Sequence, residues 1–105
     1  MTLYKPGANG AFTRTVIDIF HWQDVSMRNV IVQGTETKDT VKVWVNDTSL
    51  VFTPEKDRIV KGECLFEITN STKYKEFLTT YQNYLITRVA VLDFGGLKHI
   101  ELGGR

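Results

Sequence analysis

The sequence predicts a mainly β, antiparallel domain, barrel-like or sandwich-like, with one short α-helix around residues 71–81. Three observations support this fold class. Residues 13–69 contain short runs of β-branched and aromatic residues separated by polar turns. Residues 74–81 place apolar side chains at helical spacing, and two strand-like runs then flank a glycine pair. Consecutive short strands joined by polar turns favour an antiparallel sheet or small barrel.

The first twelve residues contain four turn-forming residues, Pro6, Gly7, Asn9 and Gly10. We therefore expect a flexible N-terminal arm over residues 1–12 and a single β-rich domain over residues 13–105. A chain of 105 residues with 42% hydrophobic residues can form one core without disulfides or metals.

Two strands are expected in the first part of the domain. The run "TRTVIDIFHWQDV", residues 13–25, is rich in β-branched and aromatic residues but keeps no single alternation. It predicts a long strand in which a bulge or bend moves the apolar side chains from one face of the sheet to the other. The run "RNVIVQG", residues 28–34, predicts the next strand, and Gly34 opens a polar loop, "GTETKD".

The clearest strand pattern is "DTVKVWVND", residues 39–47, which places three valines on one face and Lys42 and Trp44 on the other. The run "DRIVKGECLFEI", residues 57–68, predicts a further strand region that is broken or bulged near Gly62.

The predicted helix presents one apolar stripe, which begins at Tyr74 and continues through Phe77, Leu78 and Tyr81. Asn70 or Ser71 can cap its N-terminus. A helix of about three turns is marginal alone, so it must dock on the sheet. After it, "YLITRVAVLDF" and "LKHIEL" flank a Gly95-Gly96 turn and predict a β-hairpin.

Composition limits the possible functions. The net charge of +1 argues against a protein built mainly to coat nucleic acid. One cysteine indicates a reducing compartment. The N-terminus lacks a signal-peptide pattern, and no run reaches the ~18 apolar residues of a membrane helix. We expect a soluble protein made in the cytoplasm, without a membrane partner.

No residue pattern points to an enzyme, a metal or another cofactor. His21 and His99 lie in predicted strands, and neither has a third ligand at a metal-binding spacing. Cys64 lies in a strand context, where a free cysteine behaves as a small hydrophobic residue. The aromatic side chains stand beside valine and isoleucine, so we expect them in the core rather than on a stacking surface.

The most highly charged segment is "TPEKDRIVKGE", residues 53–63. Its three carboxylates each have a basic neighbour, so the charges balance. Such a mixture on a turn is typical of a solvated surface. Glu55, Lys56, Asp57 and Arg58 are therefore expected to be exposed and available for contact.

Four segments follow one another along the chain: "TRTVIDIFHWQD", "DTVKVWV", "TPEKDRIVKGE" and the C-terminal "KYKEFLTTYQNYLITRVAVLDFGGLKHIELGGR". Together they resemble small structural proteins of tailed phages and prophages of Gram-positive bacteria. The order of the segments covers residues 13–105. Proteins of this kind are encoded in the head–tail morphogenesis region, beside portal, capsid and connector genes.

The resemblance implies a head–tail connector or neck component, a head-closure or stopper-like subunit that forms a ring. The implied partners are portal or adaptor and tail proteins, with DNA passing through the lumen without tight binding. The protein would reside in the virion after assembly in the host bacterial cytoplasm. The alternatives are a tail-completion or tail-terminator protein of the same region and an unrelated β-barrel binding module.

Loops on a β scaffold commonly carry recognition. We therefore take two loops as candidate contact elements, besides the N-terminal arm. Their residues are Thr35, Glu36, Lys38 and Asp39 in the first, and Glu55, Lys56, Asp57 and Arg58 in the second.

Overall fold

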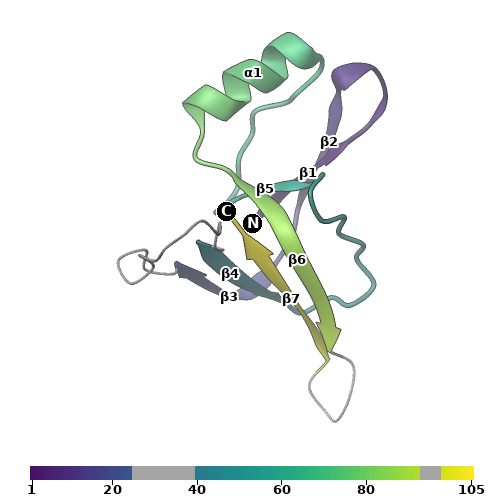
Figure 1. The fold of residues 1–105 in the computed structure, drawn as a ribbon, viewed down its shortest axis with the longest axis vertical. Coiled ribbons are helices and arrows are strands. Elements are labelled where there is room, and N and C mark those ends of the chain that lie inside the picture. Colours follow the sequence, from purple (N-terminus) through teal and green to yellow (C-terminus); the bar gives the residue numbers. More distant parts are fainter. Residues whose placement is uncertain (25–39, 93–97) are drawn as a thin grey trace, which may run out of the picture.

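The computed structural model describes residues 1–24, 40–92 and 98–105 of the chain (Figure 1). These residues form a mainly β structure with one α-helix. In chain order the elements are β1 (Thr2–Pro6), the 3-10 turn η1 (Ala8–Gly10), β2 (Phe12–Val16), β3 (Ile19–Asp24), β4 (Val41–Val45), β5 (Arg58–Val60), α1 (Ser71–Thr80), β6 (Tyr84–Leu92) and β7 (His99–Gly104). The predicted fold class is confirmed.

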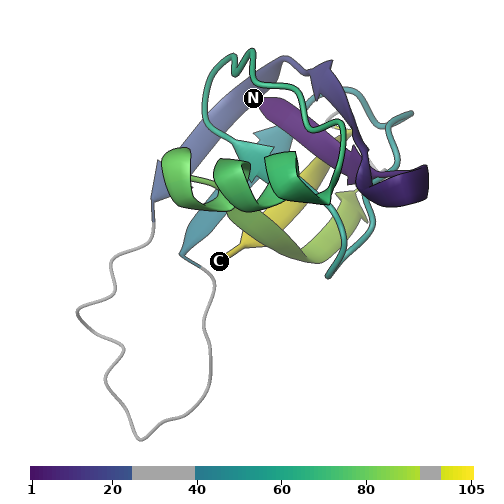
Figure 2. The same ribbon diagram turned by 90° about the horizontal axis from the view of Figure 1, so that it is seen from above.

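The described strands form one sheet in the order β2-β1-β5-β6-β7-β4-β3, and every neighbouring pair is antiparallel. β2 and β3 lie at opposite ends of this order, yet only Ile17 and Asp18 separate them in sequence. A strand that bends at this point therefore links the two ends of the sheet and curls it toward a barrel, as Figure 2 shows from above. The predicted change of facing within residues 13–25 is this bend.

Backbone hydrogen bonds hold the bend in place. The Ile17 amide donates to the Met1 carbonyl over 2.8 Å, and the Met1 amine donates to the Ile17 carbonyl over 3.0 Å. The Ile17 side chain is buried in the core. The corner is thus fixed both by hydrogen bonds and by burial of an apolar side chain.

The expectation of a flexible arm at residues 1–12 is wrong. β1 lies inside the sheet between β2 and β5, and residues 1–4 are buried. The turn-forming residues do form a turn, in which Asn9 and Gly10 adopt positive φ angles of 58° and 77°. That turn connects β1 to β2, so the run "TLYKP" before it is a strand rather than an arm.

The main core lies between the inner faces of the curled sheet. The three valines of β4 are fully buried while Lys42 is exposed, which confirms the predicted alternation. This core consists of Met1, Leu3, Ile17, Val43, Val45, Phe52, Ile59, Ile86, Ile100 and Leu102.

A second, smaller core lies under the helix, which Figure 1 shows at the end of the molecule that holds β2. The Asn70 side chain caps α1 by accepting a hydrogen bond from the Lys73 amide over 2.9 Å. Phe77 is fully buried, with its ring centroid 4.6 Å from that of Tyr4. The predicted helix is confirmed, although Leu78 of the predicted stripe remains 37% exposed.

The C-terminal hairpin is also confirmed, because Val89 of β6 pairs with Leu102 of β7, and Leu92 pairs with His99. The predicted strand at residues 28–34 lies outside the described residues. Among the residues the structure does describe, no helix is long and apolar enough to cross a membrane.

Candidate functional site

The outer face of β3, β4 and β7 carries aromatic side chains. Because the valines of β4 point inward, Trp44 points outward. Trp44 is paired with His21 of β3 on one side and with Glu101 of β7 on the other. The His21 and Trp44 rings lie 4.7 Å apart between centroids. The sheet therefore presents a ring pair on the face opposite the core.

A β-bulge adds a further aromatic side chain to this face. The register between β3 and β4 shifts between Ile19 and His21, so Phe20 is the extra residue. Phe20 is 53% exposed, and its ring lies edge-on to His99 with centroids 6.0 Å apart. A bulge can redirect a side chain in this way. Here it turns a large apolar residue toward solvent.

These side chains surround a hollow of about 450 Å³, called here the aromatic hollow. His99 Nε2 lies 3.3 Å from Glu101 Oε2, which places a polar pair beside the aromatic rings. Mainly apolar walls with a few convergent polar groups are typical of a recognition site. The full lining is Phe20, Trp44, Asn46, Lys98, His99 and Glu101.

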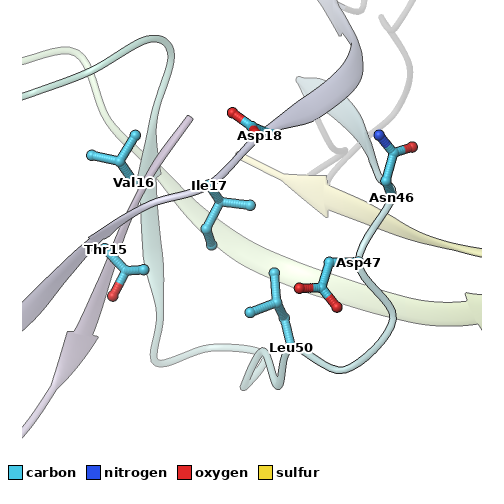
Figure 3. Close-up of a pocket in the computed structure, with 7 residues that line it drawn as sticks. All are labelled: Thr15, Val16, Ile17, Asp18, Asn46, Asp47 and Leu50. Atoms are coloured by element: carbon cyan, nitrogen blue, oxygen red, sulfur yellow. The ribbon is translucent and has the colours of Figure 1, made fainter.

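A second hollow of about 430 Å³ lies at the β2–β3 bend (Figure 3). Figure 3 shows Ile17 and Leu50 facing each other, with Asp47 beside Leu50. Asp47 accepts hydrogen bonds from the Ser49 hydroxyl and, with a smaller effect, from the Ser49 amide, and both lower the pKa of Asp47 below its usual value. The other lining residues are Thr15, Val16, Asp18 and Asn46.

The second hollow is acidic, and its charge affects the N-terminus. Burial lowers the pKa of the Met1 amine, and the negative charge of Asp18 partly opposes that change. Within the described part of the chain, no group of three or more His, Cys, Asp or Glu side chains could hold a metal ion. The aromatic hollow combines an exposed aromatic ring with a polar pair, and for that reason we treat it as the stronger candidate site.

The predicted loop contacts fall into two groups. Thr35, Glu36, Lys38 and Asp39 lie outside the described residues, so their contact role stays a prediction. In the second loop, Glu55 and Lys56 are exposed as expected. Glu55 Oε1 lies 3.7 Å from Arg105 Nη2. These two residues remain candidate contacts.

The expectation that Asp57 is exposed is wrong, because its side chain is fully buried. Asp57 Oδ2 accepts hydrogen bonds from the Thr53 amide over 2.8 Å and from Lys5 Nζ over 2.7 Å. The carboxylate closes the turn that precedes β5 and ties it to β1. Its basic partner, Lys5, is distant in sequence. The neighbouring Lys56 and Arg58 therefore suggested, wrongly, that Asp57 belongs to a solvated cluster of charges.

Arg58 is half-buried rather than exposed, and it links the sheet to the helix. Its Nε donates to the Tyr74 hydroxyl over 2.8 Å, and its Nη1 donates to Asn83 Oδ1 over 2.7 Å. These bonds connect β5 to α1 and to the segment before β6. Arg58 is thus a structural residue, and a partner would have to compete for its donors.

The two histidines and the cysteine lie in different surroundings. His21 and His99 lie in β3 and β7, as the sequence predicts. Cys64 is buried in the smaller core. Burial raises the pKa of the Tyr4 hydroxyl, which donates to the Phe66 carbonyl over 2.7 Å.

Sequence reasoning missed the aromatic hollow because it assigned the aromatic residues to the core. A usable signal was present for Trp44, which alternates with valines and shares a face with Lys42. No such signal existed for Phe20, because its exposure depends on the position of a bulge. His99 lines the hollow because its strand, β7, pairs with β4, which lies far away in sequence.

Comparison with known proteins gives one result. No curated protein and no solved structure matches the chain. Residues 1–105 match a family described as a family of unknown function, DUF6751. The match spans the whole sequence, and the chain therefore belongs to the DUF6751 family.

Proposed function

We propose that this chain is a virion assembly protein of tailed phages or prophages, a head-closure or stopper-like subunit of the head–tail connector. It forms a ring between portal or adaptor proteins and tail proteins. The resemblance of four segments over residues 13–105 supports this role. The resemblance implies a β-barrel-like protein with a small helix, and the curled antiparallel sheet with one helix is compatible with that.

The observation that carries the proposal is the presence of two different kinds of exposed apolar surface on one small chain. A ring contact is heterologous, so each subunit needs two unlike, complementary patches. The aromatic hollow is one such surface, with Phe20 53% exposed. A second apolar side chain projects elsewhere, because Leu65, between β5 and α1, is 71% exposed.

The charge is compatible with a DNA conduit. A net charge of +1 provides little of the cationic excess that holds DNA tightly. DNA could then pass through the ring lumen without being retained. The exposed Glu55 and Lys56 and the loop at residues 35–39 are the proposed contacts with portal, adaptor or tail proteins.

Electron microscopy of particles made without this protein tests the role. Loss of head closure predicts DNA-filled heads that leak or lack tails, and restoring the gene should restore complete particles. Complete tails of abnormal length would instead identify a tail-terminator. Normal, infectious particles in the absence of the chain would exclude both assembly roles.

The aromatic hollow also favours a second candidate function, a small β-barrel module that binds a peptide or oligonucleotide. Exposed rings such as Phe20 and Trp44 can stack on bases. Oligonucleotide binding would weaken steeply as salt rises. A titration with single-stranded DNA at low salt that shows no binding would exclude the nucleic-acid version.

A further inference from the structure

The segment between β5 and α1 presents an acidic and apolar ridge. Residues 63–68 alternate, with Cys64 and Ile68 buried and Phe66 partly buried. The outward positions are Glu63, Leu65 and Glu67, all exposed, and these three residues are called here the ridge. Leu65 is 71% exposed between two carboxylates.

Hydrogen bonds fix the backbone beneath the ridge. The Cys64 amide donates to Thr2 Oγ1 over 2.8 Å, and the Cys64 carbonyl accepts from Arg14 Nη1 over 3.1 Å. The Phe66 carbonyl accepts from the Tyr4 hydroxyl over 2.7 Å. The ridge is therefore held in an extended form against β1 and β2, so a partner would bind it with little cost of ordering.

The face that carries the aromatic hollow has the opposite charge. Lys42 and Arg88 are both paired with Gly103 of β7, and both are exposed. Lys98 lines the hollow itself. The lining itself is balanced in charge by Lys98 and Glu101, and the excess of cations on this face comes from Lys42 and Arg88. The face is thus apolar at its centre and basic around it, which complements an apolar side chain between two carboxylates.

We propose that the ridge of one copy docks on the aromatic hollow of a second copy, with Leu65 against Phe20 and Trp44. The ridge lies beside β1 and β2, whereas the hollow lies on β3, β4 and β7. The two surfaces are different, so each copy keeps one free after pairing. Such a head-to-tail contact continues until it closes in a ring. Ring closure rests on the proposed function, while the contact rests on the surfaces themselves.

Two variants test the contact because each disables one surface. Leu65→Asp disrupts the ridge, and Lys42→Glu combined with Trp44→Ser disrupts the hollow. Sedimentation velocity on the wild type up to about 1 mM should show association, since a contact with a millimolar dissociation constant is populated there. Each variant alone should sediment as a monomer, with circular dichroism showing that it is folded.

An equimolar mixture of the two variants is the decisive sample. The intact hollow of the ridge variant can accept the intact ridge of the hollow variant, so a dimer should form and nothing larger. Val51→Asp is the matched control, because Val51 is 70% exposed, and it should associate like the wild type.

A wild type that stays monomeric throughout, or association that Leu65→Asp leaves unchanged, would overturn the ridge-to-hollow contact. A mixture that contains only monomers would do the same. None of these results bears on the appearance of particles made without the protein. The virion role is therefore tested separately from the ridge-to-hollow contact.

Discussion

At the residue scale, the buried carboxylate of Asp57 is the main polar feature of the interior. One oxygen, Oδ2, joins Lys5 and the Thr53 amide. Among the described residues, the other oxygen, Oδ1, has no hydrogen-bond partner. A buried charge is costly unless it is paired. The Lys5–Asp57 pair therefore holds β1 to the turn before β5. Replacing Lys5 and replacing Asp57 should lower the free energy of unfolding by different amounts.

We expect Lys5→Met to lower the free energy of unfolding by about 2–3 kcal/mol, because it leaves the Asp57 carboxylate unpaired. The value lies below that of a fully buried pair, since the Lys5 side chain is 37% exposed. Asp57→Asn should cost only about 1 kcal/mol, because the amide oxygen can still accept from Thr53. Urea denaturation of both variants measures the difference.

Lys56→Met is the control for the loss of a lysine on the same side of the molecule, since Lys56 is exposed. It should change the free energy of unfolding by less than about 0.5 kcal/mol. Equal costs for Lys5→Met and Lys56→Met would show that the Lys5–Asp57 pair does not support the fold.

At the scale of the elements, the docking of α1 depends on one fully buried side chain. Phe77 packs against Tyr4 and near Phe66, whose ring centroid lies 6.2 Å away. Phe77→Ala should lower the free energy of unfolding by about 3–5 kcal/mol. Leu78→Ala on the same helix should cost less than about 1 kcal/mol, because Leu78 is 37% exposed.

Chemical denaturation followed by circular dichroism compares these two helix variants. Similar costs would mean that the helix does not dock through Phe77. A two-step transition in Phe77→Ala would show instead that the smaller core unfolds separately from the main core.

The elements that could be predicted from sequence are those whose pattern is local. β4 has a strict alternation, and α1 has an apolar stripe with a cap at Asn70. β1 was missed because its five residues precede a cluster of turn-formers, and only pairing with both β2 and β5 makes it an interior strand. Its place in the sheet depends on residues far away in sequence.

The candidate site was less predictable, for the same reason. Trp44 could be assigned to the outer face by alternation, but Phe20 depends on a bulge and His99 on pairing across strands. Asp57 was misjudged because its cationic partner, Lys5, lies 52 positions away. Local charge balance describes a surface turn correctly only when the partners are sequence neighbours.

At the scale of the whole molecule, the bend at Ile17 and Asp18 brings the two ends of the sheet together. One continuous stretch of chain thereby supplies both β2, beneath the ridge, and β3, beside the aromatic hollow. The segment that carries the ridge packs on the smaller core, whereas the strands that carry the hollow enclose the main core, and one curled sheet joins the two. A ring subunit needs a fixed geometry, because the angle between its two contacts sets whether the ring closes.

The most direct test of the central claim is the protein content of purified particles from a phage or induced prophage that encodes this chain. The account predicts a constant copy number per particle by quantitative mass spectrometry, with antibody label at the head–tail junction in electron micrographs. Complete, infectious particles that contain no trace of the chain would contradict it.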